Sequence, residues 1–409
     1  MSHTITRLGH LGEGIAEGPI YIPRALPGEV VEGEVDSGRI AAPRILTPSP
    51  DRVRASCPHY KGCGGCALMH ASDSFVADWK TDVVRRALTA QGIDAPLRPI
   101  ETSPSGTRRR ATFSGRRLKS SVLVGFHGRA SHSVVAVPNC AVLHPDLTAA
   151  LPVCEAIVKG FGSRRGTLRL ATTLSDAGID IDVTDGRALD GTDHVTLAGL
   201  AEAHDLARLS WNGEVVVERR PPVQRFDEIE VVPPPGAFLQ ATRHGEDTLR
   251  AAVVEAIGPA KSVVDLFAGC GTFALPLARR ARVHAVEAGS DMLSAADRAW
   301  RKASGLRDLS TETRDLFRRP LLPDELAHYD AVVIDPPRAG AEAQMREIVE
   351  AKIPRIAAVS CNPVSFARDA KLLIDGGYRL DWVQIVDQFR WSPHIELAAA
   401  FRRDHIASD

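Results

Sequence analysis

The stretch "VVDLFAGCGTFALPLA", residues 263–278, carries the clearest structural signal in the chain. A β-prone apolar run includes Asp265, a turn with Gly269 and Gly271 follows, and a helix-compatible run closes the segment. Glycine lets the backbone turn tightly and approach a ligand without a side-chain clash. The order strand, glycine turn, helix therefore predicts a nucleotide-type pocket, although the same order also occurs as a purely structural strand-to-helix turn.

The segments that follow extend this unit into a domain. "RVHAVEA" (282–288), "AVVID" (331–335) and "IAAVSC" (356–361) alternate with helical stretches, which is typical of a doubly wound parallel α/β fold. Residues 233–409 are therefore predicted to form a Rossmann-like α/β domain. Glu287 ends the second strand 22 residues after Asp265, where an acid commonly binds ribose hydroxyls. Because the glycine spacing is not G-x-G-x-x-G, it favours S-adenosylmethionine over NAD.

A third strand ends in "DAVVIDPPRAG", residues 330–340. Asp335 follows the apolar run, and a carboxylate at this edge of a parallel sheet faces the ligand crevice. Many methyltransferases that act on an exocyclic amine carry a similar acid-Pro-Pro with an aromatic residue after it, whereas Arg338 stands here. Methylation of an amino nitrogen is one alternative, but it would leave Cys361 and Glu396 without a role.

The fourth strand leads into "AVSCNPVSFARD", residues 358–369, and places Cys361 at the same edge. A helix beginning beside this thiol would favour its thiolate. The later segment "VDQFRWSPHIELAAAF" (386–401) contributes His394 and Glu396. Addition of a thiolate to C6 of uracil makes C5 nucleophilic toward a methyl sulfonium, and a base must then remove the C5 proton. Cys361 is the predicted nucleophile and Glu396 the predicted base; the simpler alternatives are a small buried side chain and a surface acid.

Five short segments, in order, resemble the S-adenosylmethionine-dependent RNA uracil-5 methyltransferases: "FLQ" (238–240), "DLFAGCGTF" (265–273), "DPPR" (335–338), "SCNP" (360–363) and "HIE" (394–396). The resemblance implies that one group of side chains lines the cofactor and target-base site: Gln240, Phe267, Thr272, Glu287 and Asp335. It also implies that Cys361 is the nucleophile and Glu396 the base. The chain departs from the family pattern at Thr272, where asparagine is common, and in "DQFRWSPHIE", which lacks the usual proline-bearing form of that loop.

The seven cysteines are unevenly distributed along the chain. Cys57, Cys63 and Cys66 lie within ten residues of one another, which indicates a metal site rather than a disulfide framework. Thiolates hold either zinc or an iron–sulfur cluster, and the spacing alone leaves both open. The resemblance implies that Cys140 is the fourth ligand and that the group is a 4Fe–4S cluster.

The chain before residue 233 is predicted to form two β-rich units. Residues 1–46 resemble a short TRAM domain, a small RNA-binding β-barrel. Residues 47–232 are predicted to form a central antiparallel β domain that carries the metal cluster. Within it, "GTRRRATFSGRRLK" (106–119) holds six basic residues and no acid, a pattern that suits RNA phosphates but also a solvated strand face. The target base must leave its stack, so an RNA loop is the expected substrate.

The composition sets the broad class of protein. The chain has 409 residues, 25% of them charged and 44% hydrophobic, with a formal net charge of −1. It shows no signal-peptide pattern and no apolar run long enough for a membrane span. We therefore expect a cytoplasmic, monomeric enzyme that makes 5-methyluridine. The resemblance favours 23S rRNA over tRNA as the substrate, and a catalytically inactive RNA-binding module with the same fold is the alternative from another class.

Overall fold

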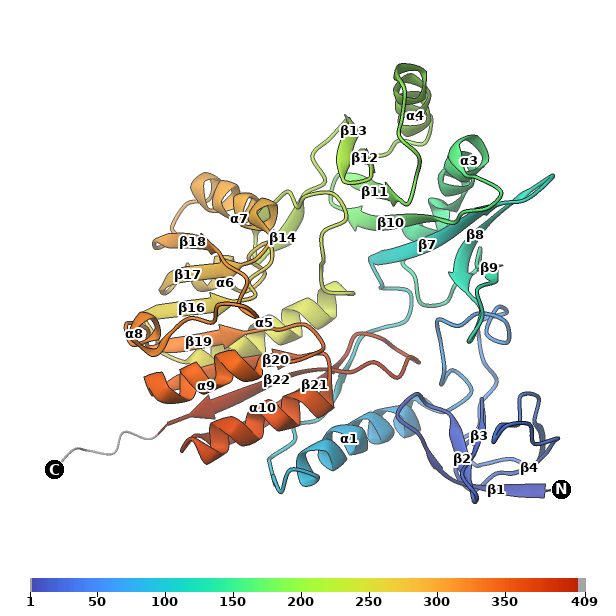
Figure 1. The fold of residues 1–409 in the computed structure, drawn as a ribbon, viewed down its shortest axis with the longest axis horizontal. Helices are drawn as coiled ribbons and strands as arrows, with labels where there is room; N and C mark the ends of the chain where they lie inside the picture. Colours follow the sequence, from blue (N-terminus) through green and yellow to red (C-terminus); the bar gives the residue numbers. More distant parts are fainter. Residues whose placement is uncertain (1, 404–409) are drawn as a thin grey trace.

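The structure, a computed structural model, describes residues 2–403. Within these residues the chain forms sheets of five, seven, two and eight strands (Figure 1). No helix in this part of the chain is long and apolar enough to cross a membrane.

The eight-stranded sheet is the centre of the C-terminal unit. Its strand order is β18-β17-β16-β19-β20-β22-β21-β6. The strands are β6 (Glu101–Thr102), β16 (Ser262–Leu266), β17 (Arg282–Glu287), β18 (Leu309–Thr313), β19 (Ala331–Ile334), β20 (Arg355–Ser360), β21 (Arg379–Asp387) and β22 (Glu396–Arg402). Strands β16 to β20 pair in parallel, and β22 runs antiparallel between β20 and β21. The predicted doubly wound α/β fold is confirmed.

Helices cover both faces of this sheet, so its inner strands are apolar throughout rather than alternating. Val263 of β16 belongs to one hydrophobic core and its neighbour Val264 to the other. The helices are α1 (Asp73–Thr89), α5 (Arg243–Ile257), α6 (Ala274–Leu277), α7 (Ser290–Lys302), α8 (Pro323–Leu326), α9 (Glu342–Ala351) and α10 (Pro363–Asp375). In Figure 1, α9 and α10 lie on one side of the sheet, and α1 lies beside α10.

Two elements from the middle of the chain also join this sheet. Helix α1 is capped by Ser72, whose side chain accepts a hydrogen bond from the Phe75 N–H, and its Val84 and Leu88 pack into the core shared with α9 and α10. Strand β6 pairs in parallel with the end of β21. Both elements fall within residues 47–232, so the C-terminal unit recruits part of the segment that was predicted to be a separate central domain.

The seven-stranded sheet has the order β13-β12-β11-β10-β7-β8-β9. Its elements are β7 (Arg110–Arg117), β8 (Val122–His127), β9 (Val134–Ala136), α2 (Pro145–Ala149), α3 (Leu151–Phe161), β10 (Leu168–Ser175), β11 (Gly178–Thr184), α4 (Gly191–Ala203), β12 (Arg208–Trp211) and β13 (Glu214–Glu218). All pairs are antiparallel except β11 and β12, which are parallel. The prediction of a purely antiparallel sheet is therefore wrong at this pair, because helix α4 provides the long crossover that parallel strands need.

The N-terminal unit is a five-stranded antiparallel sheet of order β3-β2-β1-β4-β5. Its strands are β1 (Ser2–Leu8), β2 (Gly14–Ala16), β3 (Ile20–Ile22), β4 (Val30–Glu32) and β5 (Arg44–Thr47). It encloses a small core of its own that includes Ile5, Ile22 and Val31.

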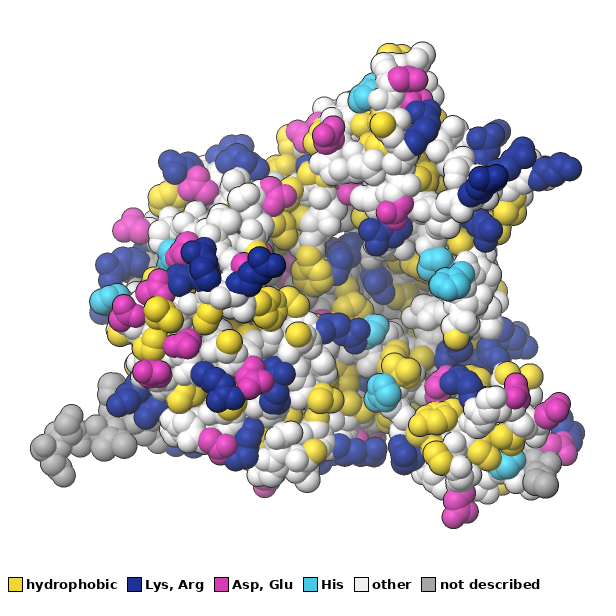
Figure 2. All heavy atoms as spheres, in the orientation of Figure 1, with side chains coloured by type: hydrophobic (Ala, Val, Ile, Leu, Met, Phe, Trp, Pro, Cys, Tyr) yellow, Lys and Arg dark blue, Asp and Glu magenta, His cyan; other side chains and the backbone are white. Residues whose placement is uncertain are grey.

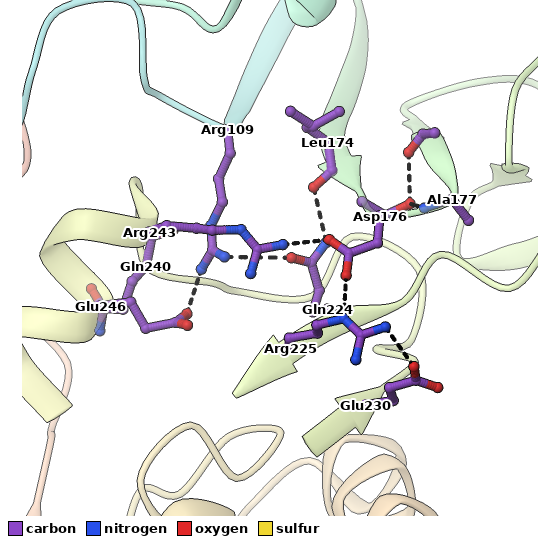
Figure 3. A network of polar contacts seen from close by, with 12 residues as sticks. Arg109, Leu174, Asp176, Ala177, Gln224, Arg225, Glu230, Gln240, Arg243 and Glu246 are labelled. Atoms are coloured by element: carbon purple, nitrogen blue, oxygen red, sulfur yellow. Dashed lines mark hydrogen bonds and ion pairs between the residues drawn. The ribbon is translucent and has the colours of Figure 1, made fainter. Parts of the chain in front are cut away.

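A buried polar network joins the central sheet to the C-terminal unit, next to the short hairpin of β14 (Gln224–Phe226) and β15 (Ile229–Val231) (Figure 3). Arg109 is buried and forms an ion pair with the buried Glu246 of α5. Its guanidinium also donates to the backbone oxygen of Gln240 (3.1 Å) and to the side chain of Gln224 (3.5 Å). Arg109 was predicted to face RNA phosphates, but its charge is fully engaged inside the protein, so this residue is a structural one.

Candidate active site

The carboxyl ends of four parallel strands meet at one edge of the eight-stranded sheet. Phe267 follows β16, Glu287 ends β17, Asp335 follows β19 and Cys361 follows β20. Ligands of open α/β sheets bind at this edge. The fold therefore places the predicted nucleophile and three of the predicted cofactor residues along one border of the sheet.

The glycine turn after β16 has the backbone conformation that its sequence requires. Gly269 and Gly271 have positive φ angles of 55° and 86°, and Phe267 has a φ of 63°, which is uncommon for a residue with a side chain. The carboxylate of Glu287 accepts hydrogen bonds from the N–H groups of Gly269 (3.1 Å) and Gly289 (3.0 Å). Glu287 thus shapes the turn. A Cβ atom placed on Gly269 would meet only the end of the Met292 side chain, at 4.0 Å, so the space beside the turn is open.

Two further acids make this edge strongly acidic. Asp265 is completely buried, and neither of its carboxylate oxygens has a hydrogen-bond partner among the described residues. Burial and the nearby charge of Asp335 raise the pKa of Asp265 well above its usual range, and removal from water raises the pKa of Asp335 to about 7. A ligand that carries positive charge and hydroxyl groups would satisfy these acids. The residues at this edge therefore fit S-adenosylmethionine.

The two other predicted cofactor residues lie close to this edge. Thr272 sits half-buried in the glycine turn, directly after Gly271. Gln240 is buried ahead of α5, and its side-chain oxygen accepts a hydrogen bond from Gln388 at 2.6 Å. The Gln388 side-chain oxygen in turn accepts the N–H of Ala241 at 2.7 Å. Gln240 is therefore tied to the segment that leads to Glu396, and its role toward a cofactor or base stays a prediction.

A cavity of about 780 Å³ opens beside the sheet edge and extends toward the central sheet. Figure 2 shows the molecule hollowed between these units, with arginine, lysine and histidine side chains gathered along the hollow. The residues that line the cavity include Arg108, Phe238, Arg338, Cys361, Phe389, His394 and Glu396. Cys361 and Glu396, 35 residues apart in the sequence, thus line the same cavity.

The thiol of Cys361 is half-buried and has acidic neighbours. Burial and the charges of Glu396 and Asp335 raise its pKa to about 11, and Arg338 opposes this effect. Helix α10 begins at Pro363, close to this thiol, but burial and the two acids outweigh any gain from the helix start, so the pKa of Cys361 is raised. The Asn362 side chain caps that helix by accepting the Val364 N–H (3.1 Å), while burial and two acids act directly on the sulfur.

Glu396 is almost completely buried at the start of β22. Burial and the charge of Asp335 raise its pKa to about 8, while a hydrogen bond with Gln388 and the charges of Arg110 and Arg338 lower it. A carboxylate with a pKa near neutral suits a group that accepts a proton in one step and releases it later. Glu396 is therefore not a solvated surface acid, and its role as the base stays a prediction.

The raised pKa of Glu396 predicts how stability depends on pH. Since this pKa is about 8 in the folded chain against an ordinary 4.5, the folded state holds a proton that the unfolded state releases. Wild-type stability should therefore fall as the pH rises from about 4.5 to about 8. Glu396→Gln should remove this loss, by at most about 5 kcal/mol for the full shift. Urea denaturation of both proteins at pH 5, 7 and 8 checks this; a stability difference independent of pH would contradict it.

The predicted metal ligands also line this cavity: Cys57, Cys63, Cys66 and Cys140. Cys57, Cys63 and Cys66 lie in one loop, in which Cys63 forms an isolated β-bridge with Gly128, just after β8. Cys140 follows β9. Burial and the neighbouring cysteines raise the pKa of Cys66 to about 12. No disulfide and no group of three or more ligands spaced around a single metal ion occurs in residues 2–403. The four thiols thus line one cavity but do not form a ready-made metal site, so the metal and its ligand set both stay predictions.

Several side chains at the site were not predicted from the sequence. Phe389 lines the cavity without a motif that marks it individually, and Phe238 lines it as the first residue of "FLQ", a segment in which only Gln240 was given a role. Lys80 is buried on α1, and a signal for it did exist: Val76, Lys80, Val84 and Leu88 follow at spacings of four, so a lysine stands within an apolar helix face. A charged residue in that position needs a buried partner.

The strand order, the acidic glycine-turn edge and the thiol beside it define a methyltransferase with a mixed α/β fold. A family model described as tRNA (Uracil-5-)-methyltransferase matches residues 237–403. An uncharacterized RNA methyltransferase of Brucella suis is 42% identical, over 98% of this chain and 97% of the relative. A 23S rRNA (uracil(1939)-C(5))-methyltransferase of Shewanella baltica is 31% identical, over 98% of this chain and 95% of the relative. The chain therefore belongs to the RNA uracil-5 methyltransferase family and is an S-adenosylmethionine-dependent enzyme.

The fold is also that of a solved structure. The Pyrococcus abyssi tRNA (uracil-54, C5)-methyltransferase, in complex with S-adenosyl-L-homocysteine, superimposes with a TM-score of 0.77. The match covers 98% of this chain and 99% of the other at 21% sequence identity. The likeness extends over all three parts of the chain, and at this identity it concerns the fold.

Proposed function

We propose that this enzyme forms 5-methyluridine in RNA by covalent catalysis. The Cys361 thiolate adds to C6 of the target uracil, and the electrons of the C5–C6 double bond move toward the C4 carbonyl. C5 then attacks the methyl group of S-adenosylmethionine, so a C–C bond forms and the C–S bond of the sulfonium breaks. Glu396 removes the remaining C5 proton, the double bond re-forms, and the Cys361 thiolate leaves.

The observation that carries this proposal is the shared cavity of Cys361 and Glu396. The charge of Glu396 contributes to the raised pKa of Cys361, so the two groups interact. The reaction needs a nucleophile and a proton acceptor beside the same uracil ring, because the proton leaves C5 while the sulfur is bound to the neighbouring C6. An amine methyltransferase would need neither group.

The chain's own residues would hold the cofactor at the acidic edge. Glu287 and Asp335 would face its ribose and its positive charge, and Gln240, Phe267 and Thr272 would complete the site, as the family resemblance implies. S-adenosylmethionine supplies an electrophilic methyl group. Its positive charge beside Glu396 and Asp335 would also lower the pKa of Cys361, which burial and these acids raise in the free enzyme.

We propose 23S rRNA as the substrate, with tRNA as the alternative. Support comes from the Shewanella baltica relative, whose name specifies 23S rRNA. The test is nucleoside mass spectrometry on 23S rRNA and tRNA purified separately from a strain that lacks the gene. Loss of one 5-methyluridine from 23S rRNA supports the proposal, and loss from tRNA supports the alternative. An unchanged 5-methyluridine content in both, with no S-adenosylmethionine binding by calorimetry, would indicate an inactive RNA-binding module.

The remaining parts of the chain are proposed to bind RNA. Arg116, Arg117 and Lys119 are exposed at the tip of the β7–β8 hairpin, where Figure 2 shows a projecting cluster of basic side chains. Such a cluster suits RNA phosphates. We propose that the N-terminal sheet is a TRAM-like RNA-binding unit. Its last strand, β5, ends at Thr47, so the predicted division after residue 46 moves to the end of β5. The division at residues 232/233 is kept, with α1 and β6 assigned to the catalytic unit. We also propose that the enzyme is a cytoplasmic monomer.

We further propose that Cys57, Cys63, Cys66 and Cys140 hold a 4Fe–4S cluster. Thiolates from two segments that line one cavity are a suitable ligand set, and N–H groups approach the sulfurs, as the Gly65 N–H does at Cys63 (3.4 Å). The methyl transfer needs no electron, so these four residues would order the loop between the N-terminal and central units.

Metal analysis of the protein purified without oxygen should find about four iron atoms and about four sulfides per chain. Cys140→Ser should lose most of this iron because it removes one ligand. Cys154→Ala is the matched control, since Cys154 is a buried core residue that does not line the cavity. One zinc ion per chain, or unchanged iron in Cys140→Ser, would contradict the assignment.

A further inference from the structure

The loop of residues 388–395 joins β21 to β22 and ends at Glu396. It carries Phe389 and His394 into the cavity. Its Trp391 has a φ of 61°, a conformation that residues with side chains rarely adopt and that persists only when the surroundings hold it. Inside the loop, the Ser392 N–H donates to the Phe389 oxygen (2.9 Å). The backbone of Glu396 pairs with Val386 of β21, so contacts from outside act on Glu396 through the loop that leads into it.

Lys80 of α1 holds the loop at three points. Its ammonium group donates to the carboxylate of Asp387 (2.6 Å) and to the backbone oxygens of His394 (2.9 Å) and Phe389 (3.3 Å). An ammonium group has three N–H donors, so all of them are used. Lys80 is completely buried and Asp387 nearly so, which means that no water replaces these contacts. The lysine fixes both ends of the loop, one of them two residues before Glu396.

A second set of contacts holds the tip of the loop. Asp73, at the start of α1, pairs with Arg390 (2.5 Å) and accepts a hydrogen bond from the Trp391 indole (3.1 Å). The N–H groups of Ala67 and Leu68 both donate to the Trp391 oxygen, at 2.8 and 2.9 Å. All these partners lie within residues 67–80, directly after Cys66.

We propose that Lys80 is a positioning residue that holds Glu396 in place for removal of the C5 proton, with Asp73 supporting the loop tip. A general base must reach the proton that it removes, either directly, at about 3 Å, or through one water. A shift of about 1 Å in a supporting loop can reduce a rate about 100-fold. The inference rests on the proposed function, since it concerns the last step of that reaction.

The experiment compares Lys80→Met, Asp73→Ala and the wild type on RNA whose uridines carry hydrogen or deuterium at C5. Lys80→Met should lower turnover about 100-fold. It should also raise the deuterium isotope effect and accumulate a covalent enzyme–RNA adduct, because addition and methyl transfer continue while proton removal slows. Asp73→Ala should change both readouts in the same direction but less. Lys371→Met, which breaks an exposed Lys371–Asp375 pair on α10, is the matched control and should change neither.

The isotope effect distinguishes a positioning role from a merely structural one. Partial unfolding would lower the turnover rate but leave the ratio of the rates with hydrogen and deuterium unchanged. Slower turnover with an unchanged isotope effect and no adduct in either variant would overturn the inference. If Lys80→Met does not fold, Asp73→Ala decides, because the Asp73 side chain is 60% exposed. Failure of the wild type to make 5-methyluridine would overturn the proposed function instead, and is recognised from the wild-type reaction alone.

Discussion

Cys361→Ala should abolish 5-methyluridine formation, with a loss of about 10⁴-fold or more in turnover. Without the sulfur no covalent bond forms at C6, and C5 of a plain uracil is too poor a nucleophile to attack the methyl group. Loss of an enzyme nucleophile typically costs factors of this size or larger. The measurement is transfer of a labelled methyl group from S-adenosylmethionine to RNA, with product identified as 5-methyluridine.

The control for this variant is its cofactor and RNA binding. Cys361 is half-buried at the cavity wall and follows β20, whereas the glycine turn follows β16, so calorimetry should find S-adenosylmethionine binding close to that of the wild type. Cys154→Ala, in the core of the central sheet, should keep its activity. A Cys361→Ala enzyme that methylates RNA near the wild-type rate would disprove covalent catalysis by this residue.

Glu396→Gln should trap the enzyme on its RNA. The amide keeps the shape of the side chain but cannot accept the C5 proton, so the methylated adduct forms and fails to resolve. Turnover should fall about 10²- to 10⁴-fold, the usual contribution of a general base. A denaturing gel should show a slow band that contains both protein and RNA and depends on S-adenosylmethionine.

The double variant Cys361→Ala with Glu396→Gln should lose the slow band, because the band requires the sulfur. Glu342→Gln is a matched control on the exposed surface of α9 and should show neither the band nor a loss of rate. Glu396→Gln without any adduct, but with slow release of free 5-methyluridine RNA, would indicate that another group removes the proton.

The Lys80 and Glu396 variants together test whether Lys80 acts through Glu396. Both are expected to accumulate the adduct, yet only Glu396→Gln should gain stability at alkaline pH, because only it removes a buried acid with a raised pKa. Lys80→Met leaves Asp387 buried without its partner and should lose stability. The two effects on stability thus have opposite signs while the chemical readout is shared.

By itself, the sequence determined the α/β fold of the C-terminal unit and the edge of the sheet at which Asp335 and Cys361 stand. Strand-end positions follow from local patterns of apolar runs and turns, and parallel strands bring their carboxyl ends together. Only the tertiary structure decided which distant groups act on one another. Lys80 meets Asp387 across 307 positions, Arg109 turns inward to Glu246, and the pKa of Cys361 rises because Glu396 and Asp335 lie beside it. Burial and charge act through space, and no local pattern in the chain records those distances.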